Sequence, residues 1–595
     1  MAIRRLGSLI ASASIVVVFL FYLRTYLINN QTFPRPSSGQ SEGQQSTFKI
    51  EEPTAQYSPI PYTNSREHPA DLLVKQSERE FEDIRSRQSR TLDEAVDEYK
   101  RRYGIPPPPR FDEWYRFAHK NGVQLIDEYD TIYHSLLPFW GLKPATIRAR
   151  VREALGYDDN ALIGIMIRGG KVTHVQAGPE WQQQATIGMM QKFLRSLPDM
   201  DLAFNIHDES RVVVPHDELS RLVAIAKEHN MPAALAHEGH TNAFSPRPKD
   251  LNRGKRIDEV KTTRFTMFAH QPTWIPSRLS CSPDSPARAL EDDPAHDNLT
   301  AYAMSDLGFI YNHTAFSDIC NSPSLAASHG FFVRPNAFNL VHDLFPIFSQ
   351  SKMSSFNDIL YPSPWYWYGK VEYDALKDMN WQQKENKLWW VGSTTGGFSR
   401  DGGWRRQHRQ IMVKKLNGLD NAQVLADTNP NAGQSGQQGA PNWQTKEAPR
   451  QDYKDLIDVH FSHVGQCDPG DCDAMKEFFT IVKPADQQAA WKYKFLLDLD
   501  GNAFSGRFYA FLKSKSLTFK MNFFREWHEE WLKPWVHYIP LSLRGEEALE
   551  AVRYFSGETE GKAQAVRMAE AGRDWAMKTL RNEDFEAWFF RLLIE

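Results

Sequence analysis

Three polar segments, each placed at the end of an apolar run, carry the side chains best suited to chemistry. The first is the Gly/Ser/Thr-rich stretch 392–403, which follows the apolar residues Leu388–Val391. This order predicts a strand, a loop and a helix, and the backbone N–H groups of such a loop favour an anion such as phosphate. Arg400, Arg405 and Arg406 add positive charge nearby. The stretch lacks the Gly-Lys-Ser/Thr of a P-loop, so a Gly-rich turn that binds nothing is the alternative.

The second segment, Asp498–Phe508, repeats this plan after the strand predicted at Tyr493–Asp498. Arg507 stands at the start of the following helix, where the fork of guanidinium donors could hold a diphosphate. The alternative is a helix cap beside an arginine that faces water.

The third segment closes the predicted strand Asp201–Ile206 with Asn205, His207 and Asp208. Ligands of α/β sheets bind at the carboxyl ends of the strands. An aspartate at that place could act as a general base on a hydroxyl group. A polar strand end that faces water is the alternative.

Two Asp-x-Asp pairs, Asp199 with Asp201 and Asp498 with Asp500, have a spacing that places both carboxylates on one face of a strand. Such a pair can hold a metal ion, but hard cations usually take more ligands than two carboxylates supply. The sequence therefore predicts no bound metal and no other cofactor.

The elements that must position these segments alternate between strand-like and helical patterns, which favours an α/β fold over separate α and β blocks. A helical stripe at Ser77–Arg102 precedes the proline block Pro106–Pro109 and a short aromatic helix, Phe111–His119. Further strands are predicted at 161–167, 201–206, 388–391 and 493–498, with helices at 404–417 and from Arg507, and a helical tail from Gly545. A polar insert at about 429–445 reads as a surface loop.

The amino-terminal residues resemble a membrane anchor. Arg4 and Arg5 precede an apolar run, Leu6–Leu23, which Arg24 closes. A run of this length suits a transmembrane helix, and the basic residues before it should stay in the cytosol, so the rest of the chain would face the lumen. A cleaved signal peptide is the alternative. The Ser-, Gln- and Pro-rich residues that follow read as a flexible stem.

The cysteines and glycosylation sequons agree with a lumenal chain. Four cysteines permit three pairings, of which local closure between Cys467 and Cys472 is favoured; the others are Cys281 and Cys320. Three N-x-Ser/Thr sequons stand at Asn30, Asn298 and Asn312.

Composition excludes one large class of partner. The chain has 595 residues, enough for more than one domain, with 70 basic and 74 acidic residues and a net charge of -4. This near balance lacks the basic surplus of nucleic-acid-binding proteins, so no nucleic-acid partner is predicted.

Together the segments resemble glycosyltransferase family 90, which includes fungal capsule-associated transferases and Rumi-like protein O-glucosyl- and xylosyltransferases. Three blocks carry the resemblance: 198–208, 390–406 and 493–540. The last is the most specific, with Tyr-Lys-Phe-Leu-Leu-Asp-Leu-Asp-Gly-Asn-Ala-Phe-Ser-Gly-Arg-Phe and Leu-Lys-Pro-Trp-Val-His-Tyr-Ile-Pro. Residues 358–365 and 103–115 are also similar to the family, so the resemblance runs with gaps from about residue 100 to the end.

The resemblance implies a GT-B architecture, in which two Rossmann-like domains face a cleft. It implies metal-independent, inverting transfer of xylose or glucose from a UDP-sugar to a hydroxyl of a glycan or glycoprotein. Carried over by position, Asp208 resembles the catalytic base. The expected donor-binding residues are Gly392, Ser393, Thr394, Gly396, Arg400, Arg406, Ala503, Ser505 and Arg507. Trp365 and Trp367 could stack on the acceptor sugar, with core packing as the alternative.

The expected organisation follows from these segments. It comprises a cytosolic tail (1–5), a transmembrane signal anchor (6–28), a stem (29–76), a helical region (77–144), a first Rossmann-like, acceptor domain (145–385) and a second, donor domain with a helical tail (386–595). The resemblance and the anchor imply a single-pass type II protein of the Golgi or endoplasmic reticulum membrane, with the catalytic part in the lumen.

Two positions depart from the family pattern. Val391 and His207 stand where many relatives carry arginine. The missing charge at Val391 opens an alternative, a relative that binds UDP or glycan, or organises other enzymes, without turnover. Neither a binding protein nor a scaffold needs a base, so the co-occurrence of Asp208 with both loops favours the enzyme.

Overall fold

The computed structural model describes residues 66–237, 239, 241–257, 260–289, 296–336, 338–429 and 441–595. The predicted tail, the anchor at 6–28, most of the stem and the sequon at Asn30 lie outside these residues. Among the residues that are described, no helix combines the length and apolar character needed to cross a bilayer. The predicted insert joins β11 (Asn421–Asp427) to β12 (Trp443–Pro449), and its residues 430–440 lie outside the described part.

The helical region begins earlier than predicted and is divided. The helix expected at 77–102 is two helices, α2 (Pro69–Ser86) and α3 (Leu92–Tyr103), followed by α4 (Phe111–Lys120) as expected. The division occurs because Thr91 and Glu94 form a capping box, in which each side chain accepts a hydrogen bond from the backbone of the other.

The stem predicted to reach residue 76 is also too long. Residues from Pro69 onward are helical because Ala70, Leu73 and Val74 are buried in the hydrophobic core that also holds the second sheet. Burial of these side chains offsets the loss of chain entropy that composition alone had suggested would keep the segment unfolded.

The first sheet has the strand order β2-β1-β3-β8-β9. Its strands are β1 (Leu162–Arg168), β2 (Lys171–Gln176), β3 (Met200–Asn205), β8 (Ile347–Ser349) and β9 (Ile359–Leu360). β3, β8 and β9 run parallel, whereas β1 is antiparallel to both of its neighbours. The sheet is therefore mixed: it is parallel from β3 to β9, as in a Rossmann-like sheet, and antiparallel at β2 and β1.

The second sheet has the order β13-β10-β14-β15-β16, and all of its strand pairs are parallel. Its strands are β10 (Glu385–Ser393), β13 (Ile457–His463), β14 (Tyr493–Leu499), β15 (Leu517–Met521) and β16 (Ile539–Pro540). Parallel strands present their carboxyl ends at one edge, so the loops after β10, β13 and β14 meet there. The strands predicted at 388–391 and 493–498 form the centre of this sheet.

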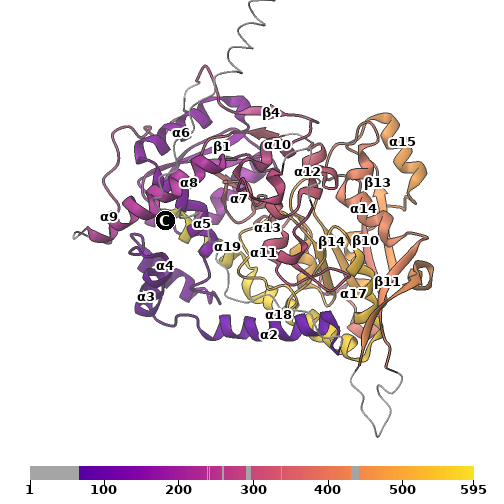
Figure 1. Cartoon of the computed structure of the whole chain (residues 1–595). Helices are drawn as coiled ribbons and strands as arrows, with labels where there is room; N and C mark the ends of the chain where they lie inside the picture. Colours follow the sequence, from indigo (N-terminus) through magenta and orange to yellow (C-terminus); the bar gives the residue numbers. More distant parts are fainter. Residues whose placement is uncertain are drawn as a thin grey trace, which may run out of the picture. The chain divides into compact units, whose positions relative to one another are not determined.

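Helices connect and cover the sheets (Figure 1). Those of the first half are α5 (Asp130–Leu136), α6 (Pro144–Gly156), α7 (Glu180–Met190), α8 (His216–Ile225), α9 (Met231–Ala236), α10 (Trp274–Ser277), α11 (His313–Phe316), α12 (Gly330–Val333) and α13 (Pro364–Trp367). The second half has α14 (His408–Leu416), α15 (Pro469–Phe478), α16 (Phe508–Lys513), α17 (Glu546–Gly557), α18 (Thr559–Thr579) and α19 (Asn582–Ile594). Three short strand pairs complete the fold: β4 (Thr266–Phe268) with β7 (Phe338–Leu340), β5 (Ala303–Met304) with β6 (Phe309–Ile310), and β11 with β12.

The helical tail returns to the first half of the chain. Phe585, Trp588 and Phe589 of α19 are buried in the same core as α4 and the strands of the first sheet. In Figure 1 the carboxyl terminus accordingly lies beside α5. The boundary expected for the second domain, 386–595, therefore does not describe how α19 packs, because a sequence range cannot show that its last helix crosses back.

Both pairs of cysteines form disulfides. Cys467 is joined to Cys472, which confirms the predicted local closure, and Cys281 is joined to Cys320. Two disulfides agree with an oxidising compartment.

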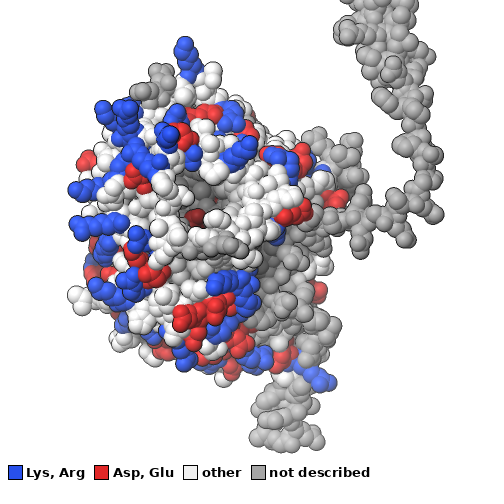
Figure 2. Space-filling model, turned by 90° about the vertical axis from the view of Figure 1, so that its left-hand side faces the viewer, with Lys and Arg blue, Asp and Glu red and all other residues white. Residues whose placement is uncertain are grey.

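A large cavity, of about 1030 Å³, lies at the amino end of β3, away from the loop that carries Asp208. Its walls come from α6, α8 and the end of α19, and Figure 2, which faces this side, shows the surface hollowed. Most of its lining is apolar. Its acidic side chains are paired within the protein, for example Asp201 with Arg168 and Asp250 with Arg148.

A buried ion pair ties the segment before β10 to the second sheet. The Lys384 ammonium bonds the Asp378 carboxylate, and both side chains are fully buried. Asp378 also accepts the backbone N–H of Lys515 at 2.7 Å. Because burial removes water from both charges, each depends on the other for stabilisation.

We expect Lys384→Met to lower the free energy of unfolding by roughly 3–5 kcal/mol, since it leaves the Asp378 charge buried without its cation. The control is Lys377→Met, because Lys377 lies on the surface near Asp374 and should contribute less than about 0.5 kcal/mol. Chemical denaturation of both variants measures the difference. Equal stability of the two variants would show that the buried pair is not needed.

Candidate active site

Asp208 lies in the turn after β3, where its carboxylate reaches solvent. Gln350, which follows β8 and is 5% exposed, donates its side-chain N–H to Asp208 Oδ1 at 3.3 Å. The surrounding protein removes hydration from the carboxylate and raises the pKa of Asp208 above its ordinary value. A base with a raised pKa holds a transferred proton better, which suits proton abstraction near neutral pH.

Buried polar groups fix the backbone of this turn. Asn205 Nδ2 donates to Glu209 O at 2.7 Å, and the Asn205 side-chain oxygen accepts the N–H of His207 at 2.9 Å. The Arg211 backbone N–H donates to the buried Asp358 carboxylate at 3.1 Å. His207 stays neutral at pH 7, because burial lowers its pKa to about 4. These contacts hold the turn in one conformation. Within it, Asp208 is the carboxylate that is exposed to solvent, whereas Glu209 is buried.

A chain of hydrogen bonds joins Asp208 to the second half of the protein. Gln350 Oε1 accepts the hydroxyl of Ser363 at 2.7 Å, and Ser363 Oγ accepts the backbone N–H of Trp365 at 3.2 Å. The Trp365 indole N–H then donates to Gly506 O at 3.3 Å, in the loop after β14. Because each link has a buried or half-buried partner, the chain sets the position of Asp208 relative to that loop.

The loop after β10 holds four of the predicted donor-binding residues, Gly392, Ser393, Thr394 and Gly396. Several of its N–H groups already bind protein acceptors: Thr394 donates to His463 O at 3.0 Å, and Gly396 to Asn502 Oδ1 at 3.2 Å. The cradle of free N–H groups predicted from the sequence is thus partly occupied. An anion here must depend largely on side-chain cations.

Glycines bring this loop against the first half of the chain. A Cβ on Gly330 of α12 would lie 1.8 Å from Gly396 O, so no larger side chain fits. Gly396 has a φ of 116°, which is open to glycine and strained for other residues. The close approach of α12 therefore requires glycine at position 330, and the backbone conformation of the loop favours glycine at position 396.

Two arginines converge on the carboxyl end of β10. Arg507 donates to Val391 O at 2.9 Å, and Arg409 donates to Ser393 O at 3.2 Å and to Asp500 O at 2.7 Å. Each guanidinium lies 5.7 Å from the Trp390 ring centroid. Burial, and then the charge of Arg507, lower the pKa of Arg409 to about 10, so it stays protonated.

The sequence analysis named Arg507 but not Arg409, which the structure places at the same end of β10. It chose Arg400 and Arg406 instead, but Arg406 is exposed and Arg400 pairs with Asp468 at 2.6 Å on the surface. The available signal for Arg409 was its place in the first turn of a helix directly after a Gly-rich loop.

The Asp-x-Asp pair after β14 serves the protein itself. Asp498 binds the hydroxyl of Ser505 and the ammonium of Lys520, the latter at 2.8 Å. Asp500 Oδ2 accepts the N–H of Phe523 at 2.7 Å. These contacts shape the second loop, in which Ala503 and Ser505 are both buried. Asp201 of the other pair binds Arg168 at 2.6 Å.

The two tryptophans proposed for the acceptor have different surroundings. Trp365 lies between the halves, with its indole N–H on Gly506 O and its ring 6.0 Å from that of Trp181. Trp367 packs on α7 so closely that a Cβ on Gly188 would lie 2.3 Å from its ring. The structure thus leaves Trp365 as the better placed of the two. The sequon Asn298 is exposed, whereas Asn312 caps α11 by accepting the N–H of Ala315.

Comparison with known proteins finds a family match over the later part of the chain. Residues 332–595, which include both loops and both arginines, match the model of glycosyl transferase family 90. This part of the chain belongs to glycosyl transferase family 90. Asp208 lies outside the family 90 match, so its role depends on geometry and on the resemblance of its segment.

The relatives are distant and only partly covered. The chain is 26% identical to O-glucosyltransferase rumi of Drosophila melanogaster over 266 residues, which cover 42% of this chain and 53% of that protein. It is 38% identical to the O-glucosyltransferase rumi homolog of Anopheles gambiae over 106 residues, 17% of this chain and 26% of that protein. It is 31% identical to Protein O-glucosyltransferase 1 of Bos taurus over 123 residues, 20% of this chain and 30% of that protein. The chain thus spans about half or less of each relative's length.

The Asp500 carboxyl gives the site a testable pH dependence. Burial raises its pKa to about 7, so the folded protein binds a proton there that the unfolded chain, with an ordinary aspartate, has already lost. Between about pH 4 and pH 7 this group therefore destabilises the fold progressively as pH rises, by up to about 1.4 kcal/mol per unit.

We expect Asp500→Asn to remove this dependence. Its amide oxygen can still accept the N–H of Phe523, so the variant should gain thermal stability over the parent at pH 8 and gain little at pH 4. Melting temperatures of both proteins across that range measure the effect. A stability difference that does not vary with pH would show that Asp500 is ionised throughout.

Proposed function

We propose that the protein transfers glucose or xylose from a UDP-sugar to a hydroxyl of a glycan or glycoprotein, with inversion at the anomeric carbon. The observation that carries this proposal is the hydrogen-bonded chain from Asp208 through Gln350 and Ser363 to the loop after β14. It couples a base on the first half to the loop that carries Arg507 on the second. A protein that only binds UDP or glycan has no need of this base.

In the proposed reaction, Asp208 takes the proton of the acceptor hydroxyl as its oxygen attacks the anomeric carbon. The bond from that carbon to the diphosphate oxygen breaks, and UDP leaves with the electron pair. Arg409 and Arg507 stabilise the negative charge of the leaving diphosphate. The cation missing at position 391 is thus supplied from α14 and from the start of α16.

The family and the disulfides support a lumenal site of action. Two disulfides suit the secretory pathway, and the rumi relatives are named as O-glucosyltransferases. We therefore keep the proposal of a type II protein of the Golgi or endoplasmic reticulum, anchored by residues 6–28.

The first experiment measures UDP release by the purified protein from a panel of UDP-sugars, with EDTA present. We expect release from one donor, and its loss by at least about 10²-fold in Asp208→Asn, because the amide cannot take the proton. UDP affinity and melting temperature should change little. Equal activity of Asp208→Asn would remove this residue from the mechanism, and failure to bind UDP at all would overturn the proposed function.

The pH profile of the parent gives an independent check. Since the base must be deprotonated, kcat/KM should fall as pH drops through the pKa of Asp208, and the raised pKa places this fall above the range of an ordinary aspartate.

The donor-binding role of Arg409 is tested by Arg409→Gln. The loss of a charge-assisted hydrogen bond costs about 1.5–3 kcal/mol, so the Kd for UDP should rise roughly 10- to 100-fold. The matched control is Arg406→Gln, because the Arg406 side chain is exposed and three residues away. If Arg406→Gln weakens UDP binding as much as Arg409→Gln does, the assignment of the cation is wrong.

A further inference from the structure

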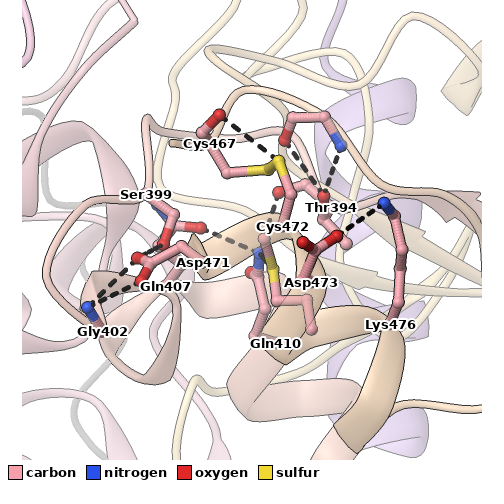
Figure 3. The surroundings of a disulfide bond; sticks show 12 residues. Thr394, Ser399, Gly402, Gln407, Gln410, Cys467, Asp471, Cys472, Asp473 and Lys476 are labelled. Carbon is pink, nitrogen blue, oxygen red and sulfur yellow. Dashed lines mark hydrogen bonds and ion pairs between the residues drawn. A yellow bond between two sulfur atoms is a disulfide. The ribbon is translucent and has the colours of Figure 1, made fainter. Parts of the chain in front are cut away.

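The stretch 392–403 after β10, here called the donor loop, is in contact with the segment that follows β13. Residues 464–472 follow β13 and run into the first turn of α15, and Figure 3 shows Cys467, Asp471 and Cys472 of this segment near Thr394, Ser399 and Gly402. The Cys467–Cys472 disulfide closes this segment at the start of α15. Nothing in the proposed chemistry uses these residues.

The contacts are numerous and reciprocal. Gly465 N donates to Thr394 Oγ1 at 3.0 Å, while Thr394 Oγ1 donates to Gly465 O at 3.1 Å. Ser399 N donates to Gln466 O at 2.8 Å, and Asp468 N donates back to Ser399 O at 2.9 Å. The two stretches thus pair as a short parallel bridge, centred on Ser399 and Cys467.

Asp471 makes the central side-chain contact. Its carboxylate accepts the hydroxyl of Ser399 at 2.6 Å and the backbone N–H of Gly402 at 3.0 Å. One side chain therefore holds the loop at two points, three residues apart. Asp473, two positions further along α15, points away and pairs with Lys476 at 3.1 Å (Figure 3).

The segment needs a covalent constraint to keep this shape. Gln466 has a φ of 55°, in the left-handed region that non-glycine residues seldom occupy. Most of residues 462–474 are exposed or half-buried, so little apolar packing fixes them. The disulfide spans the part of the segment that carries Asp468 and Asp471 and limits its alternative conformations.

We infer that the disulfide-closed segment 464–472 is the positioning element of the donor loop, with Asp471 as its principal positioning residue. It holds the outer end of the loop, while Arg409 holds the inner end through Ser393 O. The segment touches no reacting atom, and it acts by keeping the loop in the conformation that meets the diphosphate. The inference rests on the proposed function only for its effect on the donor.

The test compares Asp471→Ala, Asp471→Asn and the double variant Cys467→Ser/Cys472→Ser with the control Asp473→Ala. Hydrogen–deuterium exchange of the amides of residues 393–403 reports on the loop directly, whether or not the protein is an enzyme. We expect exchange to accelerate at least about tenfold in Asp471→Ala and in the double variant. Asp471→Asn, which keeps one acceptor oxygen, should lie between them and the parent, and Asp473→Ala should match the parent.

The kinetic readout separates positioning from general damage. In a parent that releases UDP, KM for the donor should rise about three- to tenfold in Asp471→Ala and in the double variant, with kcat changed less than twofold. Loop exchange equal to that of the parent, or an unchanged donor KM alongside faster exchange, would overturn the inference. Faster exchange in the variants of a parent that binds no UDP would retain the positioning element and refute only the proposed function.

Discussion

The buried guanidinium groups of Arg409 and Arg507 have little contact with water, and this constrains the arrangement of the second sheet and its loops. Removing a guanidinium from water is costly unless its donors find acceptors. The carboxyl end of a parallel sheet supplies them, because the last carbonyls of its strands have no further strand to bind. Arg507 accordingly donates to Val391 O, and Arg409 to Leu499 O and Asp500 O. The parallel arrangement of β10 and β14 thus supplies the carbonyl acceptors that allow the two buried cations to lie near each other.

The need to balance these buried positive charges also explains why Asp498 and Asp500 lie near the two arginines. The Asp498 carboxylate attracts the charge of Arg507 and binds Lys520, while burial raises the pKa of Asp500 to about 7. The Asp-x-Asp pair therefore balances charge and shapes the second loop. In the sequence alone, Asp498 and Asp500 have the spacing of a metal-binding pair. The structure distinguishes the two roles, because both carboxylates are buried and bonded to protein groups.

The sequence predicts the parts of this fold that depend on local pattern. Strands β1, β3, β10 and β14 and the closure of Cys467 with Cys472 follow from apolar runs and short spacing. What it misses depends on distant contacts. Arg406 ends a short 3-10 helix and is exposed, whereas Arg409 lies in the first turn of α14 and is buried against the ends of β10 and β14. The early start of α2 and the return of α19 depend on cores made by residues hundreds of positions away. The loop after β10 was predicted because Gly, Ser and Thr are typical of such loops, but the pattern could not show that protein acceptors already occupy several of its N–H groups.

At position 391, the positive charge near the end of β10 comes from another part of the chain. A valine there removes a charge that many relatives of this family are expected to carry, yet Val391 O receives the guanidinium of Arg507. Its side chain packs in a small apolar cluster with Trp389 and Phe511, so an arginine in its place would have to leave that cluster. The positive charge therefore comes not from β10 but from Arg409 and Arg507, at the starts of α14 and α16. Since Gly330 packs on Gly396 and Trp365 bonds Gly506, the loops that precede those helices also contact the first half of the chain, so the surroundings of the cations depend on both halves.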